Sequence, residues 1–173
     1  MKHIKLLGIG LDVKNNAISI AKPIKGLTYI EILNTTKIDK QENIYNYIGD
    51  IIKSYEDYFI TLAINRPLPL FFIKELTCYD FKLYPHFGYA KERKRIIIPL
   101  RNWERKENKN IKSVIEKYSQ DFSKPDKMNF NLYQSDSALF SILAIYFQIV
   151  KRSSKIPAMC IDIANEEGWI SEN

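Results

Sequence analysis

Apolar and polar positions alternate along the chain with periods that predict most of its secondary structure. Residues 4–12 form an apolar run that ends in a single carboxylate, Asp12, and a short polar turn separates this run from a second one at 16–22. A third run covers 28–33. Short apolar runs bounded by turn residues are typical of strands, so these three runs predict a three-stranded meander.

A helix and a buried strand are expected after the meander. Isoleucine and tyrosine recur at helical spacing between residues 44 and 55, which predicts an amphipathic helix. The continuous apolar run at 59–64 predicts a strand that is buried on both faces. A strand–helix–strand unit implies a crossover connection, so the two strands of this unit should be parallel.

The remaining pattern extends the sheet and adds helices. Residues 96–98 predict a strand stopped by Pro99. Residues 159–162, in the C-terminal tail, are compatible with a short strand that is not counted in the sheet. The order β-β-β-α-β-α-β-α-α predicts an α/β fold with a mixed five-stranded sheet and helices on both faces. We expect one domain over 1–173, with its core at 4–150 and a tail at 151–173. The further predicted helices cover 69–79, 104–118 and about 133–150.

Composition and charge narrow the class of protein. With 173 residues, of which 46% are hydrophobic, the chain is long enough for one globular domain with a real core. Its net charge is +6, and residues 91–127 hold 12 Lys/Arg against 6 Asp/Glu, so this segment carries the whole surplus. Such a basic segment suits a phosphate backbone, although a solvated helix face would look the same.

Several function classes are disfavoured by what the sequence lacks. There are 2 histidines and 2 cysteines, so a multi-histidine metal site, a Ser-His-Asp triad and a zinc site are not expected. The N-terminal residues do not resemble a signal peptide, and the longest apolar stretch, at 138–150, is too short to cross a membrane. We therefore expect an intracellular protein of the cytoplasm or nucleoid.

Two aspartates lie at the ends of apolar elements, where a carboxylate suits metal binding or catalysis. Asp12 ends a buried strand, and an unpaired charge beside a core is costly, so the residue suits a metal ligand or a catalytic carboxylate. An alternative is that Asp12 only caps its turn through nearby backbone amides. Asp136 lies in the first turn of the last predicted helix, three residues before Leu139, and therefore near its buried side.

Four short motifs stand at strand ends and at the start of the last helix: Ile9-Gly10-Leu11-Asp12-Val13-Lys14-Asn15, Ile64-Asn65-Arg66-Pro67, Ile98-Pro99-Leu100-Arg101-Asn102-Trp103 and Ser135-Asp136-Ser137-Ala138-Leu139. Their order and spacing resemble the ribonuclease H-like superfamily, and within it the RuvC-type and poxvirus-type Holliday junction resolvases. The resemblance covers residues 4–150. It implies a ribonuclease H-like fold and a metal-dependent endonuclease that acts on branched or structured DNA.

The resemblance implies a specific chemistry. In this family, divalent cations (Mg²⁺ or Mn²⁺) between several carboxylates activate water and stabilise the leaving oxygen of a phosphodiester. Carried over to this chain, Asp12 and Asp136 would be metal ligands and catalytic residues, and Asn65 would occupy a third catalytic position. The sequence departs from the family pattern twice, because Asn65 stands where a glutamate is usual and Tyr133 where a second acid of the last helix is usual.

The resemblance also implies partners. The region after the fifth strand would face nucleic acid, with Trp103 available to stack on exposed bases. Family members often work as dimers on a two-fold junction, so a homodimer is expected. The residues expected to bind nucleic acid are Lys91, Arg93, Lys94, Arg95, Arg101, Trp103, Arg105, Lys106, Lys109 and Lys112.

Two other functions stay open. The chain could be a catalytically degenerate nuclease-fold protein that binds nucleic acid or acts as a scaffold in a complex. It could also be a fragment of an actin-like ATPase, which opens with a similar Asp, but it is short and lacks a second glycine-rich phosphate loop. The number of carboxylates near Asp12 separates the first two functions: three or more favour an enzyme, and two beside Asn65 favour a binding protein.

Overall fold

The computed structural model of the protein describes residues 4–13, 15–24, 29–65, 76, 78–83, 94–100 and 136–152. The predicted helix at 104–118 and the predicted strand at 159–162 lie outside these residues, and so does most of the predicted helix at 69–79. The described elements are β1 (Leu6–Asp12), β2 (Ala17–Ile24), β3 (Tyr29–Lys37), α1 (Gln41–Ser54), β4 (Phe59–Asn65), β5 (Lys82–Leu83), β6 (Arg95–Leu100) and α4 (Asp136–Arg152).

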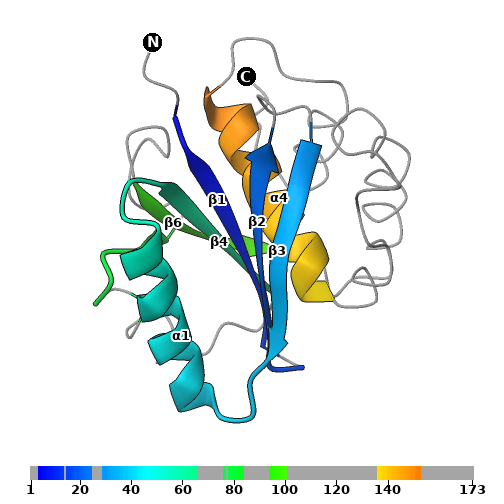
Figure 1. Ribbon diagram of the computed structural model, residues 1–173, viewed down its shortest axis with the longest axis vertical. Coiled ribbons are helices and arrows are strands. Elements are labelled where there is room, and N and C mark those ends of the chain that lie inside the picture. Colours follow the sequence, from blue (N-terminus) through cyan, green and yellow to red (C-terminus); the bar gives the residue numbers. More distant parts are fainter. Residues whose placement is uncertain are drawn as a thin grey trace.

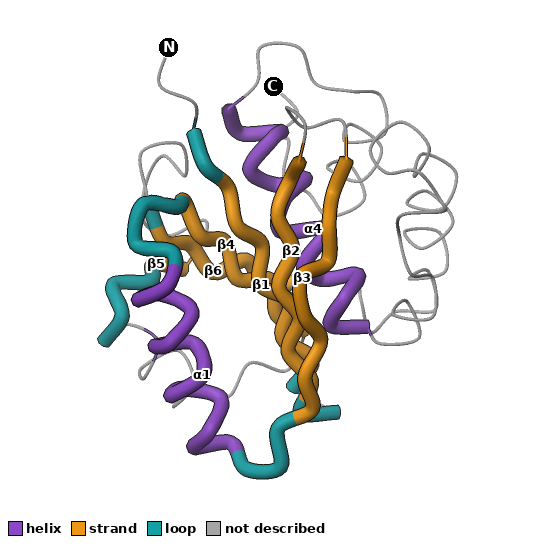
Figure 2. The backbone as a smooth tube through the Cα atoms, in the orientation of Figure 1, coloured by secondary structure: helices purple, strands orange, loops and turns teal. Residues whose placement is uncertain are grey.

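The strands form one mixed sheet with β1 in its interior, as Figure 2 shows. The strand order is β3-β2-β1-β4-β6-β5. Strands β1, β2 and β3 are antiparallel neighbours, which confirms the predicted meander. Strands β4, β6 and β5 continue the sheet in parallel with β1. The α/β class and the mixed sheet are therefore confirmed, and the two-residue strand β5 extends the five predicted strands.

Strands β3 and β6 extend furthest beyond their predicted ends. Strand β3 runs on to Lys37, because its polar residues Asn34 and Thr35 still pair with β2. Strand β6 passes through Pro99, which was expected to stop it. Proline is tolerated here because the described pairing of β5 reaches only as far as Ile97, so among the described residues no ladder partner on that side needs the missing N–H.

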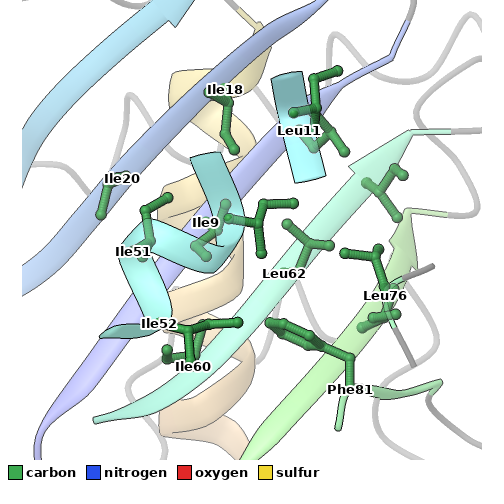
Figure 3. Packing of buried hydrophobic residues seen from close by; sticks show 14 of the residues in the cluster. Ile9, Leu11, Ile18, Ile20, Ile51, Ile52, Ile60, Leu62, Leu76 and Phe81 are labelled. Carbon is green, nitrogen blue, oxygen red and sulfur yellow. The ribbon is translucent and has the colours of Figure 1, made fainter. Parts of the chain in front are cut away.

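One face of the sheet carries the main hydrophobic core, beneath α1. Alternate residues of β1, including Ile9 and Leu11, point to this face, where they pack with Leu62 of β4 and with Ile48 and Ile51 of α1. Figure 3 shows these sheet residues facing the helix. The isoleucine spacing that predicts this helix thus matches the side that it buries.

The other face of the sheet is covered by α4 (Figure 1). The described side chains of this helix are buried along most of its length. The main chain of this helix touches β1 at Gly10 through Ser137 and at Gly8 through Ser141, so α4 runs antiparallel to β1. Near the other end of the helix, the Gln148 side chain donates a hydrogen bond to Thr61 of β4. Within the described part of the chain, no helix is long and apolar enough to cross a membrane.

Candidate functional site

Asp12 is held at the carboxyl end of the central strand. Its side chain is only 1% exposed, and the strand's alternation puts it on the same face as Gly8 and Gly10, which is the face that α4 covers. Asn15 binds both carboxylate oxygens: its backbone N–H donates to Oδ1 at 3.3 Å and its side-chain Nδ2 donates to Oδ2 at 2.6 Å. Asp12 therefore does cap its turn, and these hydrogen bonds also orient the carboxylate.

Asp136 opens α4 at the same end of the sheet. Ser137, its neighbour, has its hydroxyl oxygen 2.7 Å from that of Ser19, and Ser19 is the ladder partner of Gly10. Asp136 directly precedes Ser137, which lies beside Gly10 of β1. Asp12 follows Gly10 by two residues on the same strand. The structure therefore brings the first turn of α4 and the end of β1 together, although they are far apart in the sequence.

The third predicted catalytic position lies at the same edge. Asn65 is the last residue of β4, one step beyond Ile64, which pairs with Leu11 of β1. The backbone of Asn65 pairs with Leu100, the last residue of β6. The carboxyl ends of the three neighbouring strands β1, β4 and β6 consequently share this edge, which is where parallel strands of α/β sheets deliver functional residues.

The donor set suits a hard cation. Magnesium is commonly held by one or two carboxylates, with water and substrate phosphate completing its shell. Asp12 and Asp136 belong to elements that pack together at this end of the sheet, and carboxylates are the kind of ligand that such an ion takes. Among the residues that the structure describes, no group of three or more His, Cys, Asp and Glu side chains is placed to hold a metal. Among the described residues, therefore, no third acidic side chain joins Asp12 and Asp136 in one group.

Only two of the residues predicted to contact nucleic acid, Lys94 and Arg95, are among those that the structure describes. They lie at the amino end of β6, opposite Ile60, and therefore at the edge of the sheet away from Asp12. Lys94 is exposed, whereas the Nη1 of Arg95 donates to the backbone oxygen of Tyr79 at 2.9 Å. The other predicted contacts lie outside the described residues: Lys91, Arg93, Arg101, Trp103, Arg105, Lys106, Lys109 and Lys112.

Sequence reasoning missed the polar groups that join α4 to the sheet. Ser19 and Ser137 are both fully buried, and each lies inside an otherwise apolar or helical stretch. The sequence did offer one signal for this contact. Ser19 lies between two isoleucines of β2, and these isoleucines point to the hydrophobic core on the opposite face of the sheet. A polar residue at such a position needs a buried hydrogen-bond partner, but the sequence does not say which one.

Two comparisons of the sequence with known proteins found no match. No protein-family model matches the chain, and no curated protein matches its sequence at a significant level. The fold and the site by themselves define the class: an α/β domain with a mixed sheet, in which the helix that begins at Asp136 packs against the central strand that ends at Asp12.

Proposed function

We propose that this chain is a metal-dependent endonuclease domain of the ribonuclease H-like class, related to RuvC-type resolvases and acting on branched or structured DNA. The observation that carries the proposal is that α4 begins at Asp136 and its next residue, Ser137, packs on β1 at Gly10, two residues before Asp12. The meander followed by a parallel crossover to β4 supports the same class.

The two aspartates would hold Mg²⁺ or Mn²⁺. A cation bound there would supply an activated water for hydrolysis of a phosphodiester. The chain's own contribution is orientation. Asp12 is fixed by the strand ladder and by its two hydrogen bonds from Asn15, and the helix turn that carries Asp136 is held by the packing of α4 on β1. The negative charge of Asp136 also suits the N-terminus of its helix.

The basic segment supports a nucleic-acid partner. The chain leaves β6 at Leu100, on the edge that also holds Asp12 and Asn65, and the basic residues from Arg101 onwards follow directly. Phosphate contacts near the candidate site are therefore expected from this later part of the segment. Lys94 and Arg95 precede β6 or begin it, so they belong to the opposite edge.

A second candidate function is nucleic-acid binding, or a scaffold role, without cleavage. Two observations favour it. Among the described residues no third acidic side chain groups with Asp12 and Asp136, and two carboxylates beside Asn65 are the number expected of a binding protein. Asn15 also donates hydrogen bonds to both carboxylate oxygens of Asp12. The neutral residue Asn65 at the end of β4 agrees with this candidate, because an amide brings no charge to a cation. Both candidates predict binding to branched DNA, and only the first predicts cutting.

Cleavage of a labelled four-way DNA junction tests the proposal, with linear duplex alongside and with Mg²⁺, Mn²⁺ or a chelator present. We expect metal-dependent cutting that Asp12→Asn abolishes and that Asp50→Asn, an exposed carboxylate on α1, leaves unchanged. A junction that is bound but never cut would support the second candidate. Absence of binding would overturn both nucleic-acid functions. The mass of the free and bound protein, measured in the same samples, tests the expected homodimer.

A further inference from the structure

Three hydroxyl groups connect the sheet to the first turn of α4. The Ser19 hydroxyl on β2 lies 2.9 Å from that of Thr35 on β3 and 2.7 Å from that of Ser137 on α4. Ser19 and Ser137 are fully buried, and Thr35 is half-buried. A buried hydroxyl is costly unless it is hydrogen-bonded, so these side chains are expected to hold one another in fixed geometry.

This hydroxyl chain (Thr35, Ser19 and Ser137) ends beside the candidate metal site. Ser19 is paired with Gly10, where the main chain of Ser137 rests directly on β1. Asp136 is the residue before Ser137, and Asp12 lies two residues beyond Gly10 on the same face. Any movement of Ser137 against the sheet would therefore move Asp136 relative to Asp12.

The apolar surface of α4 does not determine how the helix is rotated about its own axis. A specific contact is therefore needed to set that rotation. Residues 138–140 and 142–147 are all apolar and buried, so hydrophobic side chains surround the helix and no narrow stripe selects the side that faces the sheet. Hydrogen bonds are directional, and buried polar pairs can select one packing among several of similar apolar burial. Along α4, Ser137 bonds Ser19 at one end and Gln148 bonds Thr61 near the other.

We infer that Thr35, Ser19 and Ser137 are positioning residues of the candidate metal site: they fix the first turn of α4 against β1, so that Asp136 is held beside Asp12. This inference rests on the proposed function for its link to a metal. The positioning itself is a property of the fold, and it is measured separately below. Partners that orient metal ligands commonly change metal affinity by 10- to 100-fold when they are mutated.

Two measurements on the full chain without DNA test the inference. The first is Mn²⁺ affinity, from titration followed by electron paramagnetic resonance. We expect Ser19→Ala and Ser137→Ala each to weaken binding on the order of tenfold, and the double variant to be little worse than either single one, because both remove one interaction. Thr35→Val, a milder change at a half-buried site, should weaken it less, and Thr35→Ser should restore it.

The second measurement is hydrogen exchange of the backbone amides of Phe140 and Ser141, which report on the first turns of α4. We expect faster exchange in Ser19→Ala. The matched control is Ser141→Ala, which deletes another buried hydroxyl of α4 whose hydrogen bond, to the Ala138 carbonyl oxygen, stays inside the helix. This control should lose some stability while its Mn²⁺ affinity stays within twofold of wild type.

The outcomes separate the two proposals. If the wild-type chain binds no Mn²⁺, the metal-dependent function is overturned, and hydrogen exchange alone decides whether the hydroxyl chain positions α4. If Mn²⁺ binds but Ser19→Ala and Ser141→Ala behave alike in both measurements, the hydroxyl chain contributes only general stability and the positioning inference is overturned.

Discussion

Gly10 of β1 lies directly against the carbonyl oxygen of Ser137 in α4. A Cβ at Gly10 would overlap that oxygen and the backbone nitrogen of Ser141, and it would stand 2.8 Å from the Cβ of Phe140. Gly8 has the same relation to the carbonyl oxygen of Ser141. The strand and the helix therefore approach more closely than any side chain on these two positions would allow, and this approach sets the distance between the elements that carry Asp12 and Asp136.

Replacing Gly10 by alanine should accordingly be costly. The atoms in the way belong to the helix backbone, so they cannot move aside without shifting α4 from the sheet. Overpacking of a core typically costs 1–3 kcal/mol, and we expect Gly10→Ala to reduce the free energy of unfolding by about 3 kcal/mol. Urea denaturation followed by circular dichroism measures this loss.

Gly49→Ala is the matched control. Gly49 lies inside α1, where a Cβ would meet the far end of the Tyr79 side chain, 2.8 Å from its hydroxyl oxygen. Alanine gains about 1 kcal/mol over glycine in a helix interior, which offsets the small movement of Tyr79. The variant should stay within about 1 kcal/mol of wild type. Equal losses at Gly10 and Gly49 would contradict the close approach of β1 and α4.

The buried pair of Thr61 and Gln148 gives a second prediction. Gln148 donates its side-chain N–H to the Thr61 hydroxyl, and both residues are fully buried. Thr61→Val keeps the shape and suits a strand, yet it removes the acceptor, so we expect a loss of about 1–2 kcal/mol in the free energy of unfolding. Thr61→Val combined with Gln148→Met removes donor and acceptor together and should recover most of that loss. A double variant less stable than Thr61→Val would show that other contacts of Gln148 dominate.

The sequence predicted the fold most reliably where burial is simplest. Strands β1 and β4 are buried on both faces, so they appear as continuous apolar runs with clear ends. The end of β3 was missed because Asn34, Thr35 and Thr36 break the apolar run, and only pairing with β2 keeps them in the strand. Pairing is a property of two segments, so the pattern of one segment does not reveal it.

The candidate site was predictable only in part, for a related reason. Asp12 and Asp136 mark the ends of apolar elements, and such ends are visible in one dimension. The bond between Ser19 and Ser137 depends on the rotation of α4, which an evenly apolar helix does not encode. The sequence predicted that Asp12 could cap its turn, but it did not identify the donors. In the structure both donors, one in the backbone and one in the side chain, belong to Asn15.

Asn15→Asp should make the site bind divalent cations more tightly. The Nδ2 of Asn15 lies 2.6 Å from Oδ2 of Asp12, so the variant places a second carboxylate against a buried one. Without metal, repulsion between the two should lower the melting temperature at neutral pH. Mg²⁺ at millimolar concentration should then raise it by more than in wild type, because a cation binding only the folded state stabilises that state. Differential scanning calorimetry with and without Mg²⁺ measures both effects.

The control for this variant adds the same charge at the next position of the turn. Asn16→Asp is compatible with the positive φ of 50° at Asn16, a conformation that Asn and Asp tolerate, and it leaves the Asn15 partner of Asp12 in place. Its response to Mg²⁺ should match that of wild type. Equal stabilisation of both variants by Mg²⁺ would point to a general charge effect and would argue against a cation site at Asp12.

Charge removal at the two ends of β6 should affect DNA binding differently. Strand β6 ends at Leu100, at the carboxyl end of the sheet where β1 ends in Asp12, and Arg101 is the next residue in the sequence; Lys94 precedes β6 at the opposite end. Arg101→Ala should therefore reduce the slope of log affinity against log salt by about one, as expected for one lost phosphate contact, and Lys94→Ala should leave it unchanged. Arg95→Ala should act on stability instead, costing about 1 kcal/mol, because its guanidinium donates to Tyr79. Fluorescence anisotropy of a labelled junction at several salt concentrations measures the slopes. A larger change for Lys94→Ala than for Arg101→Ala would place the DNA at the amino end of β6. The DNA would then bind away from Asp12 and Asp136.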